Sequence, residues 1–161
     1  IIHRCHWHKR RNILGHLPGR LHESVKAVLN EAWSLADADV AKRRLERLAS
    51  SLEADHPGAA ASVREGLDET LTLQRLGIGG TLYKKLRSTN GIENLNSGIA
   101  TYSRNVKRWQ GGSMVVRWAC AAIVEAEKKF RRVQGWRDIG KLVTVLTDLE
   151  AKEEAAAERV A

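Results

Sequence analysis

The stretch NGIENLNSGIATYSRNVKRW, residues 90–109, has its apolar side chains three and four residues apart. They are Ile92, Leu95, Ile99, Tyr102, Val106 and Trp109. This spacing predicts one long helix with a single apolar seam. At about 100° per residue the opposite face carries the Glu93 carboxylate, and near it the cations Arg104, Lys107 and Arg108. Such a face suits a divalent metal beside phosphates, although an exposed glutamate on an amphipathic helix is the commoner explanation.

Helical periodicity continues through the rest of the chain and predicts an all-α fold of about seven helices. The expected helices include residues 5–14, 37–52, 57–76 and 113–132. Asp37 and Ser113 are predicted N-caps, and Pro57 is a predicted first helical residue. A sheet is nearly absent, with at most one short strand near residues 1–4.

The same patterns predict which side chains are buried. Trp33 and Trp118 are expected in a core, and Cys120 is expected to be a small buried side chain among apolar neighbours. The early turns of residues 113–132 are rich in apolar residues, so we expect burial on more than one face.

The composition is that of an ordinary globular chain of 161 residues, with 43% hydrophobic and 29% charged residues. No apolar run approaches the roughly 18 residues needed to cross a bilayer, so we expect no membrane partner. Two cysteines cannot build a disulfide framework, which favours a reducing cytoplasm. The chain begins without Met, in an apolar stretch, so we expect a fragment of a longer protein.

The net charge of +8 is distributed unevenly. Residues 1–19 hold four cations and no carboxylate, and residues 84–141 hold 13 cations against four carboxylates. Residues 20–76 between them are nearly balanced, with eight cations and ten carboxylates. This pattern suits a surface that binds a polyanion beside a neutral structural module, although solvated helix faces would give a similar count.

The pair Cys5 and His8 has three explanations. With His3 and His6 the two could suggest zinc, but the four side chains are crowded into six residues with no second pair downstream. An i, i+3 spacing on one helix face would let Cys5 and His8 pack together near an active site. Ordinary packing is the third explanation.

Two blocks together resemble the Mutator-type transposases of bacterial insertion sequences. The first is CHWHKRRNIL at residues 5–14, which is similar to the C-x-x-H block of that family and is followed by Leu17-Pro18. The second joins STNGIENLN at residues 88–96 to TYSRNVKRW at residues 101–109, and is similar to the family's C-terminal signature. The resemblance covers roughly residues 3–140.

The resemblance implies a DDE recombinase with an RNase H-like catalytic core and an all-helical insertion before the last acidic residue. Three carboxylates of that family hold two divalent metal ions, Mg²⁺ or Mn²⁺, for phosphodiester cleavage and strand transfer. Glu93 matches the third carboxylate, which makes it the implied catalytic and metal-binding residue. The two family aspartates belong before residue 1, so the metals are expected only in a full-length protein. The chain alone is expected to be inactive.

The resemblance also implies partners and supporting residues. Active-site support is implied for Cys5, His8, Asn90 and Asn96. DNA, as transposon ends and target, is the implied partner, and we expect it to be bound by Lys9, Arg10, Arg11, Arg104, Lys107, Arg108 and Trp109. Trp109 is the best candidate for stacking on an unpaired base. A homo-oligomer and a nucleoid-associated location in the bacterial cytoplasm are further expectations.

The implied fold combines a helical insertion subdomain with the last helices of the catalytic core, the sheet being largely missing. In this division residues 1–19 end a core strand and form the C-x-x-H helix. The insertion covers residues 20–80, the core helices with the acidic residue cover 81–146, and a frayed tail covers 147–161. Two other functions remain open, a non-catalytic basic DNA-binding module and a helical bundle that binds a protein.

Overall fold

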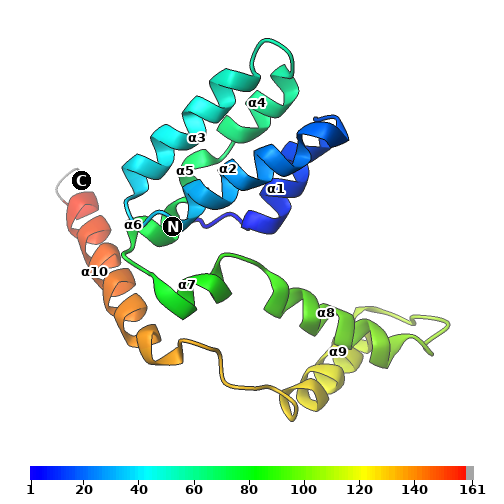
Figure 1. The fold of residues 1–161 in the computed structure, drawn as a ribbon. Helices are drawn as coiled ribbons and strands as arrows, with labels where there is room; N and C mark the ends of the chain where they lie inside the picture. Colours follow the sequence, from blue (N-terminus) through cyan, green and yellow to red (C-terminus); the bar gives the residue numbers. More distant parts are fainter. Residues whose placement is uncertain (159–161) are drawn as a thin grey trace. The chain divides into compact units, whose positions relative to one another are not determined.

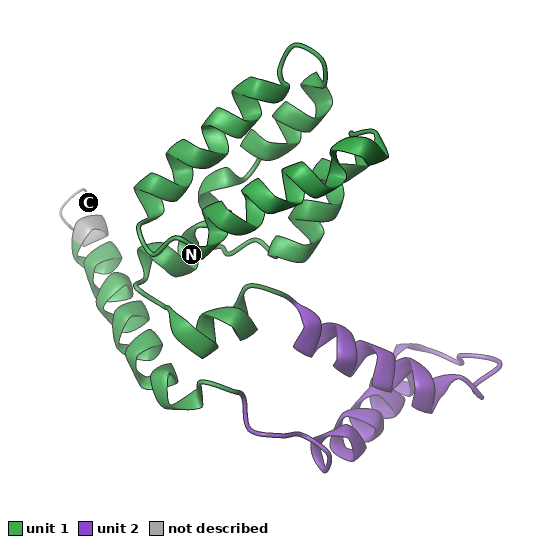
Figure 2. Ribbon diagram, in the orientation of Figure 1, with its two compact units in different colours: residues 1–88, 134–161 green, residues 89–133 purple. Residues whose placement is uncertain are grey.

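The computed structural model describes residues 1–158, and across these residues it contains helices and no strand. This confirms the predicted all-α class. The chain divides into two compact units, which are described separately (Figure 2). The larger unit comprises residues 1–88 and 134–161, and the smaller unit comprises residues 89–133. No helix within the described range is long and apolar enough to cross a membrane.

The first part of the larger unit is a bundle of helices (Figure 1). Its elements are α1 (His6–Gly15), η1 (Gly19–Leu21), α2 (His22–Ser34), α3 (Ala38–Leu52), α4 (Pro57–Arg64) and α5 (Leu67–Thr70). Leu29, Leu45 and Ala60 are almost completely buried in its core, together with the aromatic ring of Trp33. The predicted burial of Trp33 is therefore confirmed. Residues 1–5 lie outside any strand, and single hydrogen bonds hold them, such as Arg4 N–H to the Glu69 carbonyl at 3.0 Å.

Local sequence signals define the starts of two of these helices. The Asp37 carboxylate accepts the N–H groups of Asp39 and Val40 at 2.8 and 2.9 Å, and so caps α3 as predicted. These hydrogen bonds lower the pKa of Asp37. Pro57 is the first residue of α4, where its missing N–H costs no hydrogen bond.

The prediction of one helix over residues 57–76 is wrong, because the chain breaks after Arg64. Glu65 is extended, with ψ of 114°, and Gly66 adopts a left-handed conformation with φ of +61°. Glycine has no Cβ and occupies that conformation without strain. Two short helices follow, α5 and α6 (Thr72–Arg75), and this break accounts for most of the difference between ten α-helices across residues 1–158 and the expected seven.

A second apolar cluster of the larger unit lies around α7 (Gly80–Leu86). Leu73, Ile78, Leu82 and Tyr83 form it. Leu142 of α10 (Ile139–Glu158) packs on this cluster, so the end of the chain joins the larger unit. The short helix η2 (Trp136–Asp138) precedes α10. Of the tail expected to fray, residues up to 158 are helical and 159–161 lie outside the described residues.

The smaller unit is a pair of helices that pack against each other, α8 (Asn90–Ser103) and α9 (Gly112–Glu127). The predicted helix over residues 90–109 is too long by six residues. The Val106 N–H bonds to the Ser103 carbonyl at 2.9 Å, an i to i−3 turn that replaces the next α-helical bond. Residues 104–111 therefore form an irregular connection between the two helices.

The burial predicted for residues 113–132 is also wrong. In residues 89–133, all of which the structure describes, only Ala122 is fully buried. Trp118 is 40% exposed and Cys120 is exposed, because a pair of helices can cover only one face of each helix. Ser113 is the second residue of α9 and not its cap, and the helix ends at Glu127, five residues before the predicted end.

Candidate active site

Glu93 lies in the first turn of α8, and its side chain is exposed. The Thr89 hydroxyl, one residue before the helix, donates a hydrogen bond of 2.6 Å to the Glu93 carboxylate. The Glu93 N–H in turn bonds to the Thr89 carbonyl at 3.0 Å. The backbone bond belongs to the first helical turn, and the hydroxyl bond holds the carboxylate at the helix N-terminus, where the helix dipole favours negative charge.

Asn90 and Asn96 are exposed residues of the same helix, three positions before and after Glu93. Residues three apart on an α-helix are surface neighbours, so the three side chains form one row along α8. Carboxylate and amide oxygens are the ligands that Mg²⁺ accepts. The predicted catalytic residue and two of its predicted supports thus share one surface of the smaller unit.

The predicted stripe of Glu93 with three cations is not continuous. Arg104 directly follows the last residue of α8, whereas Lys107 and Arg108 lie in the irregular connection, where helical wheel angles do not apply. All three cations are exposed, and Trp109 beside them is 43% exposed. They form a basic surface on the connection between the helices.

The other predicted site residues belong to the larger unit, which carries the C-x-x-H block. Cys5 is the N-cap of α1, with ψ of 120°, and its thiol is half-buried. His8 is exposed in the first turn. Cys5 thus lies at the start of the helix and His8 three residues later, and the pairing of their side chains stays a prediction.

Lys9 is the predicted DNA-binding residue with the most unexpected position. It is 2% exposed, and its amino group donates to the Glu65 carbonyl and lies 2.9 Å from the Glu65 carboxylate. The hydrogen bonds from Lys9 and then Arg4 lower the pKa of the Glu65 carboxyl. Lys9 therefore connects α1 to the residues between α4 and α5. Its charge is paired with a carboxylate of the same chain.

A buried histidine on α1 was missed by sequence reasoning. The His6 ring stacks on Trp33 with centroids 4.4 Å apart, and its Nε2–H donates to the Thr70 carbonyl at 2.7 Å. Burial lowers the pKa of His6 to about 4, so the ring is neutral at pH 7. Burial also lowers the pKa of His3, whose ring lies 5.5 Å from that of His6. Single histidines carry no sequence signal for such a stack.

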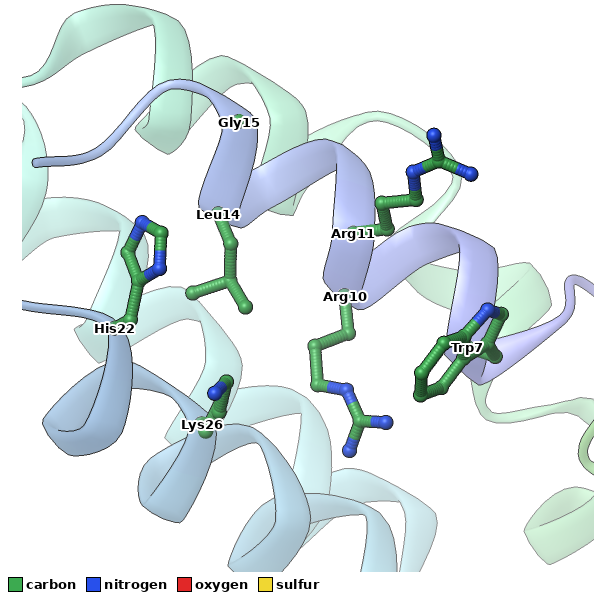
Figure 3. Close-up of a pocket in the computed structure, with 7 residues that line it drawn as sticks. All are labelled: Trp7, Arg10, Arg11, Leu14, Gly15, His22 and Lys26. Carbon is green, nitrogen blue, oxygen red and sulfur yellow. The ribbon is translucent and has the colours of Figure 1, made fainter. Parts of the chain in front are cut away.

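A hollow of about 510 Å³ lies between α1 and α2, and we call it the α1–α2 hollow (Figure 3). Its lining residues are Trp7, Arg10, Arg11, Leu14, Gly15, His22 and Lys26. The Arg10 guanidinium carbon lies 5.0 Å from the centroid of the Trp7 ring. Figure 3 shows the side chains of Trp7 and Arg10 on the α2 side of α1, whereas Arg11 points away from α2.

Across the described residues, no three His, Cys, Asp or Glu side chains form a cluster that could hold a metal ion. Glu93 is the one carboxylate of its row on α8, with the amides of Asn90 and Asn96 beside it. The donor chemistry of this row therefore suits Mg²⁺, but the row is not a complete site.

Comparison with known proteins gives one family match. Residues 1–133 match the family described as "Transposase, Mutator family". Both blocks singled out in the sequence, residues 5–14 and 88–109, fall inside this match. No solved structure matches the chain.

Three curated relatives are transposases for insertion sequence elements. The chain is 26% identical over 127 residues to that of IST2 from Acidithiobacillus ferrooxidans, a match covering 79% of this chain and 42% of the relative. It is 31% identical over 90 residues to that of IS6120 from Mycolicibacterium smegmatis, covering 56% and 27%. It is 29% identical over 127 residues to that of ISRM5 from Rhizobium meliloti (strain 1021), covering 79% and 31%. The chain thus spans less than half the length of each.

Proposed function

Because the chain belongs to the Mutator family of transposases, we propose that it acts in DNA transposition as the C-terminal part of a transposase. In this proposal Glu93 is the last of three metal-binding carboxylates, and two aspartates outside this chain are the others. The chain alone is then inactive as a nuclease.

The observation that carries the proposal is the exposed row of Asn90, Glu93 and Asn96 at the start of α8, inside the family match. The Thr89 hydroxyl restrains the Glu93 carboxylate, so the ligand is oriented before anything binds. A divalent metal ion bound there would stabilise the negative charge that builds on phosphate oxygens during cleavage. Glu93 would hold that ion, and the two amides would orient it and the carboxylate.

The basic connection after α8 supports DNA as the substrate. Arg104, Lys107 and Arg108 are exposed cations that follow Glu93 closely in the chain. Residues 89–133 hold eight cations against three carboxylates, so this unit attracts a polyanion. In our proposal these residues bind DNA phosphates. Lys9 is left out, because its amino group is buried against Glu65.

The test is Glu93→Gln in a longer protein that includes the two family aspartates. We expect strand cleavage and strand transfer to be abolished while DNA affinity stays within about twofold, because Gln keeps the shape and removes the charge that binds metal. Glu127→Gln is the matched control, since Glu127 is an exposed carboxylate of α9 in the same unit. It should keep full activity.

Two results would contradict the proposal. One is strand transfer by the Glu93→Gln protein at the rate of the Glu127→Gln control. The other is cleavage of DNA by the 161-residue chain in Mg²⁺ or Mn²⁺ that disappears on changing Glu93. Normal DNA binding with no Glu93-dependent chemistry in the longer protein would instead favour a non-catalytic DNA-binding module.

A further inference from the structure

The α1–α2 hollow has no part in the chemistry proposed for Glu93. We propose that it binds one unpaired nucleotide of a DNA strand, with the base stacked on Trp7 and the adjoining phosphates held by Arg10 and Lys26. This inference rests on the proposed function in DNA transposition. It assigns to α1 and α2 the recognition of a strand whose bases are not paired.

The aromatic surface is the first part of the argument. Trp7 is 53% exposed, although an indole ring is among the side chains most favoured by burial. Arg10 lies one turn further along α1, and its guanidinium carbon is 5.0 Å from the ring centroid. This cation–π contact restrains the ring at the surface. A restrained and exposed aromatic ring is the platform on which unpaired bases stack.

The charge of the hollow is the second part. Arg10, Arg11, His22 and Lys26 line it, and no carboxylate is among its lining residues in the described chain. The Arg10 guanidinium donates to the neutral Asn30 amide oxygen at 3.2 Å. Lys26 pairs with Glu23 at 2.7 Å, but this pair lies within α2, three residues apart, and the Glu23 side chain is 87% exposed, so a phosphate can compete with it for Lys26.

The shape and position of these groups identify the ligand. A hollow of about 510 Å³ can hold a group the size of one nucleotide, and Leu14 gives it an apolar part. Figure 3 shows Trp7 and Arg10 on α1 facing the side of Lys26 on α2. An acidic peptide would bind the cations but would have no aromatic group to stack on the indole ring. A paired base has no open face for the ring, so the geometry favours an unpaired base between two phosphates.

The probe is a duplex with a three-nucleotide single-stranded overhang that contains the fluorescent base 2-aminopurine, and a blunt duplex of the same charge is compared with it. With the 161-residue chain we expect 2-aminopurine fluorescence to be quenched on binding, as stacking on indole requires. Trp7→Ala should abolish the quenching and weaken overhang binding roughly 5- to 150-fold. Its affinity for the blunt duplex should change by less than about twofold. Trp7→Phe should restore most of the overhang affinity.

Trp136→Ala is the matched control. Trp136 also lies in the larger unit, is 44% exposed, and has the Arg137 guanidinium carbon 5.6 Å from its ring centroid. This variant should bind both probes like the unchanged chain. Circular dichroism melting of each variant shows whether the helices are retained, and Trp7→Phe keeps the test decisive if Trp7→Ala unfolds.

Four results would overturn the inference. Equal behaviour of Trp7→Ala and Trp136→Ala would show that Trp7 does not stack on a base. If poly-glutamate of equal charge displaced the overhang as efficiently as unlabelled overhang does, the hollow would be a general anion site. Binding of the blunt duplex without preference for the overhang would remove the nucleotide site and leave the proposed function intact, whereas binding of neither DNA would contradict both.

Discussion

His6 is a neutral histidine inside a folded core, and its environment explains why. Its Nε2–H is committed to the Thr70 carbonyl, and one ring face is stacked on Trp33. The other ring nitrogen, Nδ1, is buried without a hydrogen-bond partner in the described residues. Adding a proton at Nδ1 would create a buried charge with no counter-ion, so the ring resists protonation.

This resistance predicts a loss of stability in acid. The unfolded chain binds a proton at His6 near the ordinary pKa of 6.5, and the folded chain only near 4. Between those values the unfolded state holds more protons, so the free energy of unfolding falls as the pH falls from about 6.5 to 4, by about 3 kcal/mol. The lowered pKa of His3 acts in the same direction. Urea unfolding at a series of pH values measures the loss.

His6→Gln is the control for this prediction. The amide of Gln can still donate to the Thr70 carbonyl, but it does not titrate. The variant should be less stable at pH 7, because it loses the stacked ring, yet its stability should depend much less on pH. A variant with the same pH dependence as the unchanged chain would show that His6 is not the responsible group.

At the scale of single residues the sequence predicts candidates but not their surroundings. The resemblance of residues 88–96 to the family signature predicts Glu93 as the catalytic residue. Its exposure agrees with the expected face opposite the apolar seam. Lys9 was misjudged, because its ion pair with Glu65 joins residues 56 positions apart. Nothing local in the sequence distinguishes a lysine that meets such a partner from one that faces solvent.

At the scale of elements, helical periodicity predicted most of the helices, since the period depends only on local spacing. The errors fall where backbone conformation overrides that spacing. At residues 65–66 an extended residue and a left-handed glycine end α4 inside an apolar pattern that continues. After Ser103 a tight turn ends α8, although Val106 and Trp109 keep the spacing of the seam. The predicted burial of α9 was wrong for another reason. An apolar helix face in the sequence does not reveal whether another element packs against it.

One glycine determines how η2 and α10 join α7, and it gives a prediction for this element. Gly135 has φ of +81°, and a Cβ there would lie 2.5 Å from the Leu82 backbone nitrogen. Gly135→Ala should therefore lower the free energy of unfolding by roughly 2–4 kcal/mol through strain and steric overlap. Gly140→Ala is the matched control, because Gly140 lies within α10 with nothing within 4 Å of its Cβ position.

In that control alanine should raise stability by up to about 1 kcal/mol, because Gly140 is helical, in the first turn of α10, and alanine favours helical backbone more than glycine does. The two substitutions are chemically identical, so opposite signs in urea unfolding would show that backbone conformation at Gly135 is responsible. If Gly135→Ala were as stable as the unchanged chain, the close approach to Leu82 would be wrong.

At the scale of the whole molecule, some cations form ion pairs with carboxylates of the chain, whereas others are exposed on the surface. Lys42 of α3 lies 3.0 Å from the Asp68 carboxylate of α5, and Arg44 of α3 lies 2.7 Å from the Glu31 carboxylate of α2, so both pairs join two helices of the larger unit. The net charge of +8 counts these cations equally with Lys107 and Arg108, which are exposed on the connection after α8. The sequence alone therefore suits either a polyanion partner or solvated helix faces, and the structure adds which cations are paired with carboxylates.

This difference gives the last prediction, which concerns the salt dependence of DNA binding. Changing Arg104, Lys107 and Arg108 together to Gln should weaken binding to duplex DNA and reduce the slope of log affinity against log salt by up to about 3, since each lost phosphate contact accounts for about 0.9. The matched control is the triple change of residues 42–44, Lys-Arg-Arg, to Gln. It removes the same formal charge, but two of its cations are paired with carboxylates, so the slope should change by less than about 1. Fluorescence anisotropy between about 50 and 200 mM salt measures both. Equal losses would mean that DNA responds only to net charge and that the connection after α8 has no special role.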